Sequence, residues 1–175
     1  MAEEREETVL LFTNKKAGGN KGEVVANAYR KILPLDQVYE IPEQNPVEAL
    51  RSWIGRGGVK RLIVCGGDGT MGWLFNCIDE IEGEEGEFLV AMMPLGTGND
   101  LSRTFKWGPQ YSPKFLEPEY LEKVRRAKPA VLDRWLIAVM PDDPDPEGHL
   151  PFPFGFNKRQ FSHELYLAEE GEGRE

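Results

Sequence analysis

The segment Leu62-Ile63-Val64-Cys65-Gly66-Gly67-Asp68-Gly69-Thr70 gives the clearest indication of the fold. Its first part, Leu62 to Cys65, is a short continuous apolar run, as in a strand buried on both faces of a parallel sheet. Glycines follow at once, and apolar residues then recur at helical spacing at Trp73, Leu74, Cys77, Ile78 and Ile81. The stretch therefore predicts a strand, a glycine loop and a helix in immediate succession.

The same succession occurs before and after this stretch. The other predicted strands are 8–12, 37–41 and 88–93, and the predicted helices are 22–33, 46–54, a short helix from Asp100, and 118–127. A further strand is expected within 130–140, and the three acids and three prolines of 141–146 then break the pattern. We therefore divide the chain into an acidic tail (1–7), a folded unit (8–140) and an irregular, acidic C-terminal segment (141–175).

Strands that alternate with helices indicate the α/β class. Each crossover between parallel strands needs a return element, so the pattern predicts a parallel sheet with helices on both faces. Ligands of such sheets bind beyond the carboxyl ends of the strands. Glycine loops follow three of the predicted strands and should meet at that edge. The sequence thus predicts a binding site there, of the kind found in nucleotide-binding domains.

Composition excludes several classes of function. The 175 residues carry a formal net charge of -9, which argues against nucleic-acid binding through a broad basic face. Cys65 and Cys77 lack the paired spacing of a metal site or a disulfide framework, which favours reduced, intracellular thiols. No apolar run approaches the ~20 residues that cross a bilayer. We expect a cytoplasmic protein that contacts membranes only peripherally.

The glycine loops point to phosphate as the ligand. Glycine lets backbone N–H groups approach phosphate oxygens, and a following helix adds its positive N-terminal end. Asp68 could bind Mg²⁺ or accept a proton, or it could merely cap the following helix, and Thr70 could cap or contact phosphate. Lys15 and Lys16 offer local positive charge for phosphate, or they are merely solvated lysines of a surface loop. None of the loops is a Walker-type P-loop.

Three motifs carry a family resemblance. The loop Gly66–Thr70 resembles the GGDGT signature shared by diacylglycerol, sphingosine and NAD kinases. Pro94–Gly108 and Leu132–Trp135 resemble, more specifically, diacylglycerol kinases of the eukaryotic type. The loop Asn14–Gly22 is similar to the first glycine loop of that family, although Lys15 stands where proline is usual. The resemblance covers about residues 9–140.

This resemblance implies a kinase that uses ATP and Mg²⁺. It implies transfer of the γ-phosphate to the hydroxyl of 1,2-diacylglycerol at a membrane surface, giving phosphatidate. Asp68 would be the catalytic and metal-handling residue. The implied ATP site consists of Asn14, Gly18, Gly19, Gly66, Gly67, Asp68, Gly69, Thr70, Gly96, Thr97, Gly98, Asn99 and Asp100.

Two alternatives remain open at this point. Family members continue into a second, mostly β domain, and we find no such continuation after Met140. A nucleotide-binding module without turnover is therefore one alternative. The other is a small-molecule kinase of the same fold, similar to NAD kinase, which Gly66–Thr70 permits but Pro94–Leu101 and Asp133–Trp135 disfavour.

Overall fold

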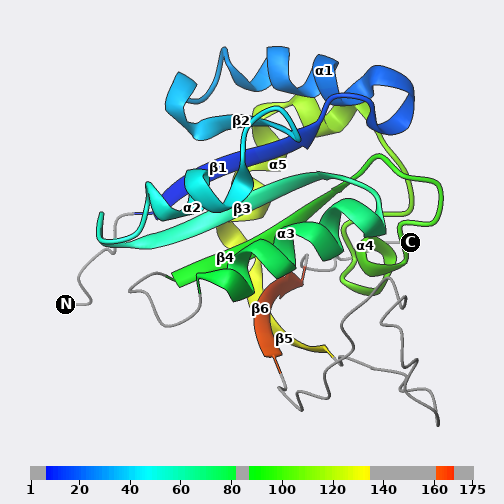
Figure 1. The fold of residues 1–175 in the computed structure, drawn as a ribbon. Helices are drawn as coiled ribbons and strands as arrows, with labels where there is room; N and C mark the ends of the chain where they lie inside the picture. Colours follow the sequence, from blue (N-terminus) through cyan, green and yellow to red (C-terminus); the bar gives the residue numbers. More distant parts are fainter. Residues whose placement is uncertain (1–6, 82–86, 135–160, 168–175) are drawn as a thin grey trace, which may run out of the picture.

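A computed structural model describes residues 7–81, 87–134 and 161–167 (Figure 1). Its centre is a six-stranded sheet with the order β2-β1-β3-β4-β6-β5. The first four strands in the chain run parallel, and they are β1 (Glu7–Asn14), β2 (Val38–Ile41), β3 (Val59–Gly66) and β4 (Glu87–Pro94). The predicted parallel α/β sheet is confirmed.

Helices cover both faces of this sheet, as predicted. They are α1 (Ala17–Tyr29), α2 (Pro46–Arg51), α3 (Asp68–Glu80), α4 (Asp100–Thr104) and α5 (Pro118–Arg126), with short 3-10 turns η1 (Leu35–Gln37) and η2 (Pro113–Leu116). One face carries α1, η2 and α5, and the other carries α2 and α3 (Figure 1). Helix α2 ends at Arg51, before the predicted end at 54.

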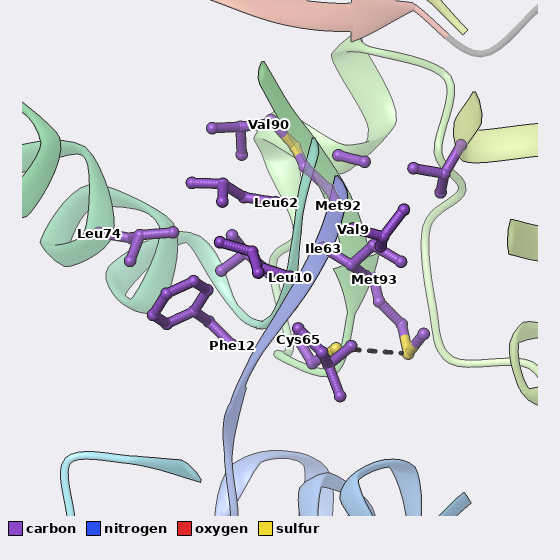
Figure 2. Packing of buried hydrophobic residues seen from close by; sticks show 14 of the residues in the cluster. Val9, Leu10, Phe12, Leu62, Ile63, Cys65, Leu74, Val90, Met92 and Met93 are labelled. Atoms are coloured by element: carbon purple, nitrogen blue, oxygen red, sulfur yellow. Dashed lines mark hydrogen bonds between the residues drawn. The ribbon is translucent and has the colours of Figure 1, made fainter. Parts of the chain in front are cut away.

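The core forms because the central strands β1, β3 and β4 bury both of their faces. Every residue of β3 is buried. Leu10 of β1 lies opposite Leu62 of β3, and both point toward Leu74 of α3 (Figure 2). Met93 points to the opposite face, where its sulfur lies 3.7 Å from that of Cys65. Full burial of one such side chain stabilises the fold by about 1.5–3 kcal/mol.

An ion pair secures the N-terminal end of the sheet. Arg61 on β3 is 7% exposed, and its Nε donates to Oε2 of Glu7 at 3.0 Å. Its Nη1 donates to the carbonyl of Val124 on α5 at 3.2 Å. A buried guanidinium needs such partners, because its desolvation is otherwise uncompensated. Glu7, which the sequence analysis placed in the acidic tail, is therefore the first residue of β1, while residues 1–6 lie outside the described residues.

The C-terminal side of the sheet differs from the prediction. Strand β5 (Lys128–Arg134) pairs antiparallel with β6 (Phe161–Leu167), and β6 pairs parallel with β4 through Val90 and Leu165. The expected irregular segment 141–175 thus contains a strand that lies between β4 and β5. The sequence of β6 alternates Phe161, His163 and Leu165 with polar residues, and the histidine obscured this two-residue period.

The remaining boundaries stay predictions. Residues 135–140 of the expected last strand, the turn-rich break after it and the acidic end of the chain lie outside the described residues. The end of β5 is nevertheless joined to α3 by two hydrogen bonds of Arg134. Arg134 Nη1 donates to Asp79 Oδ2 at 2.8 Å and Nη2 donates to Asn76 Oδ1 at 2.5 Å, which fastens β5 to α3.

Buried tyrosine hydroxyls connect α5 to the sheet and α1 to η2. Tyr120 of α5 donates to the carbonyl of Met92 at 2.7 Å, and Tyr29 of α1 donates to the carbonyl of Phe115 at 2.9 Å. Burial raises the pKa of both tyrosines above the usual value, so both hydroxyls remain donors.

We expect Tyr120→Phe to lower the free energy of unfolding by about 1–2 kcal/mol, because the buried Met92 carbonyl loses its donor. Urea denaturation, followed by circular dichroism, measures the change. Tyr111→Phe is the matched control, since that side chain is half-buried. Equal loss in both variants would contradict the anchoring role of the Tyr120 hydroxyl.

Candidate active site

Three loops meet at the carboxyl edge of the parallel sheet. Strands β1, β3 and β4 end in register, with Thr13 beside Cys65 and Gly66 beside Pro94. The loops that follow these strands therefore start side by side. Their residues are 15–20, 66–70 and 95–100, and they include nearly all the residues expected to bind nucleotide.

The second and third loops are in direct backbone contact. The N–H of Leu95 donates to the carbonyl of Gly66 at 2.8 Å. A Cβ placed on Gly96 would lie 2.5 Å from the Cα of Gly67, closer than any real contact. Glycine is required at position 96 because no side chain fits between the backbones of the two loops. The two loops therefore form one continuous surface of backbone.

The first loop joins the same surface by an unusual backbone path. Gly18, Gly19 and Asn20 have φ values of 60°, 68° and 67°, all left-handed, inside the element that begins at Ala17. A Cβ on Gly18 would lie 2.8 Å from the carbonyl oxygen of Leu95. The regular part of α1 starts only after this turn, close to the predicted start at 22.

Asp68 links the second loop to the third. Its Oδ2 accepts from the N–H of Asp100 at 3.0 Å, and its Oδ1 accepts from the N–H of Leu101 at 3.1 Å. Asp68 therefore caps α4, whereas the sequence analysis considered a cap on its own helix, α3. The residue before α3 is Gly67, which offers no side chain for capping. Each carboxylate oxygen retains a further acceptor direction.

Asn99 maintains the shape of the third loop from inside. Its side chain is 2% exposed and its backbone is left-handed, with φ 55°. Oδ1 accepts from the N–H of Gly96 at 2.9 Å, and Nδ2 donates to the carbonyls of Gly96 at 2.7 Å and Pro109 at 2.9 Å. The polar atoms of the Asn99 side chain are occupied by these internal hydrogen bonds. The side chain therefore contributes to a ligand site only by fixing the shape of the loop.

The other expected site residues differ in accessibility. Gly66 is buried against the side chain of Thr70. Asn14 accepts from the N–H of Lys16 at 3.1 Å, which maintains the turn after β1. The exposed or half-exposed members are Asn14, Gly18, Gly19, Gly67, Asp68, Gly69, Thr70, Gly96, Thr97, Gly98 and Asp100.

The positive charge expected at the first loop is reduced by a carboxylate. Lys15 Nζ lies 2.5 Å from Oε2 of Glu40, whose side chain is 8% exposed. Arg30 binds the other oxygen of the same carboxylate. Lys15 is thus directed toward β2, and Glu40 offsets the charge that Lys15 was expected to offer to phosphate. Lys16 remains exposed.

Two carboxylates flank Gly98. A Cβ on Gly98 would lie 3.1 Å from Oδ2 of Asp68 and 3.8 Å from Oδ2 of Asp100. Among the residues that the structure describes, no three metal-ligating side chains cluster. The described part of the protein therefore offers two carboxylates that a phosphate-bound cation would complement, and no complete metal cage.

The sequence analysis noted Pro94–Gly108 only for its resemblance and did not predict that residues 105–110 support the third loop. Ser102 Oγ donates to the carbonyl of Gly108 at 2.8 Å, and the N–H of Trp107 donates to the carbonyl of Ser102 at 2.8 Å. Together with the bond from Asn99 to Pro109, these contacts fold residues 105–110 back against the loop. The turn residues Gly108 and Pro109 were the available signal.

We expect Asp68→Asn to loosen α4. The amide keeps one acceptor oxygen but turns an NH₂ group toward the second N–H, so one capping bond is lost. Amide hydrogen exchange at Asp100 and Leu101 should accelerate at least tenfold, and unfolding free energy should fall by about 1 kcal/mol. Asp100→Asn is the control, because its side chain is exposed. Unchanged exchange in Asp68→Asn would contradict the capping role.

Comparison with known proteins agrees with these features. Diacylglycerol kinase 1 of Drosophila melanogaster is 38% identical over 131 residues, which cover 75% of this chain and 11% of that protein. Diacylglycerol kinase eta of Mus musculus is 36% identical over 129 residues, which cover 74% of this chain and 10% of that protein. Diacylglycerol kinase zeta of Homo sapiens is 35% identical over 139 residues, which cover 79% of this chain and 14% of that protein. No solved structure matches.

The matched region coincides with the folded unit. Residues 8–130, which include all three loops, match the model of the diacylglycerol kinase catalytic domain. The chain spans only about a tenth of the length of the curated relatives. By the extent of this match, the chain belongs to the family of diacylglycerol kinase catalytic domains.

Proposed function

We propose that this chain carries out phosphoryl transfer from ATP to the hydroxyl of 1,2-diacylglycerol, giving phosphatidate. One observation supports this most strongly. The three glycine loops form a single backbone surface at the carboxyl edge of the sheet, and Asp68 joins two of them. The names of the relatives support the lipid acceptor over the NAD-kinase alternative.

The ATP phosphates would lie over the loops. Glycines at 18, 67, 96 and 98 leave the backbone accessible, and the N-terminal end of α3 adds a favourable dipole. Catalysis of phosphoryl transfer depends mainly on positioning and charge neutralisation. A rigid surface of this kind would hold the ATP phosphates in a fixed position, because the contacts between the loops limit their movement.

Asp68 and Asp100 would hold Mg²⁺ together with phosphate oxygens. Mg²⁺ in such sites uses one or two carboxylates and several waters, which fits the two carboxylates beside Gly98. The ion supplies charge neutralisation at the transferred phosphoryl group. Without a cation, two carboxylates this close to the loops would repel ATP.

Asp68 is the proposed catalytic residue. Its two hydrogen bonds to α4 fix the carboxylate in position, and each oxygen keeps one acceptor direction for a cation or for the acceptor hydroxyl. The acceptor itself would approach from a membrane surface. Within the described ranges, no helix has the length and apolar character needed to span a bilayer.

We expect Gly98→Val to weaken ATP binding at least tenfold, or ~1.4 kcal/mol. The β-branched side chain would crowd Asp68 and the backbone beneath the phosphates. Isothermal titration with ATP and Mg²⁺ measures the affinity. Gly72→Val on α3 is the control, because a Cβ at Gly72 meets nothing within 4 Å. Wild-type affinity in a folded Gly98→Val protein would remove this loop from the ATP site.

The reaction is tested directly with ATP labelled at the γ-phosphate, Mg²⁺ and diacylglycerol in detergent micelles. We expect labelled phosphatidate, and at least a hundredfold loss of turnover in Asp68→Asn. Label transfer to NAD instead would favour the small-molecule kinase. ATP binding without transfer, under conditions in which a full-length relative is active, would favour the nucleotide-binding module without turnover.

A further inference from the structure

A cavity lies outside the glycine loops. It has a volume of about 600 Å³ and is formed by residues 107–117 and the first turns of α5. Four aromatic residues contribute to its lining, namely Trp107, Tyr111, Phe115 and Tyr120, and Tyr111 is the most exposed of them. This size and this apolar lining are typical of sites for small organic ligands. The proposed ATP site uses none of these residues.

The aromatic walls are pre-formed. The rings of Phe115 and Tyr120 are 4.8 Å apart, and that of Trp107 is 6.0 Å from Tyr120 in an edge-on arrangement. The hydrogen bond from Tyr120 to the carbonyl of Met92 attaches this cluster to the sheet. A ligand would therefore enter a cavity whose shape already exists, which lowers the entropic cost of binding.

Lysines surround this cavity. Lys123 and Lys114 line it, and Lys21 lies over the ring of Tyr111 at 5.2 Å. Lys123 is half-buried, with its ammonium 5.2 Å from the centroid of Trp107. Within the described residues, no carboxylate forms an ion pair with these three ammonium groups. The glutamates at 117 and 119 also line the cavity and balance the charges of Lys114 and Lys123, while Lys21 adds one positive charge beside the lining.

Lys123 carries an electrostatic cost that an anion would remove. Burial lowers the pKa of its ammonium, because the charged form loses water. The ring of Trp107 offsets this only in part, since a cation-π contact is weaker than an ion pair to a desolvated anion. The site therefore favours a ligand that has a negative group for Lys123 and an apolar body for the aromatic walls.

We propose that this cavity binds a single-chain anionic lipid, with its acyl chain against Trp107, Tyr111 and Phe115 and its carboxylate or phosphate at Lys123 and Lys114. A neutral glyceride would fill the apolar part but leave the lysines without an anion. Inorganic phosphate would pair with the lysines but leave the apolar part of the cavity unfilled. The proposal does not depend on the kinase reaction, because it concerns a separate cavity.

The test measures binding of oleate and of oleoyl lysophosphatidate to the full chain, below their micelle concentrations, by isothermal titration. Mono-oleoylglycerol and inorganic phosphate serve as ligand controls. We expect Lys123→Gln to weaken binding of both anions at least tenfold. Lys31→Gln, at an exposed lysine beyond the end of α1, is the matched control for net charge and should bind as the wild type does.

Several results would overturn the proposal. They are equal affinity for mono-oleoylglycerol, equal affinity for inorganic phosphate, equal loss in Lys31→Gln, and no binding of either anion. Competitive displacement of the lipids by ATP would also overturn it, because the cavity would then belong to the nucleotide. Binding of only one anion would support the proposal and identify the headgroup as a carboxylate or a phosphate.

Discussion

The Asp68 carboxylate is the contact on which the geometry of the candidate site depends. It accepts one N–H from Asp100 and one from Leu101, and so connects the end of β3 to the helix that follows β4. Charge-assisted hydrogen bonds of this kind are stronger than neutral ones. Because Gly96 packs directly on Gly67, the two loops have little room to separate. Asp68, which the sequence analysis expected to be catalytic, therefore also connects the second loop to the third.

Much of the fold was predictable because the central strands are buried on both faces. Such strands are continuous apolar runs, and the glycine loops after them are visible without any knowledge of long-range contacts. The strand predicted at residues 62–65 lies within β3. The three loops lie at one edge because the strands before them are parallel. Local pattern and global fold agree in this half of the chain.

Several details could not be predicted, because they depend on contacts that form only in the folded chain. No local pattern indicates that Asp68 caps α4 or that Glu40 binds Lys15. Asn99 was expected in the site, but its burial and its bond to Pro109 follow only from the folded loop. Strand β6 was missed because its alternation is short and its partner, β5, precedes it by 26 residues that the structure does not describe.

The position of β6 has a consequence for the order in which the sheet is completed. In the chain β5 comes first, but in the sheet β6 lies between it and β4. Strand β5 therefore has no sheet partner until residues 161–167 have left the ribosome. Until then the hydrogen-bonding edge of β4 is open to other chains, and exposed edges of apolar strands promote aggregation. A shortened fragment that retains every glycine loop but ends before Phe161 would keep that edge permanently uncovered.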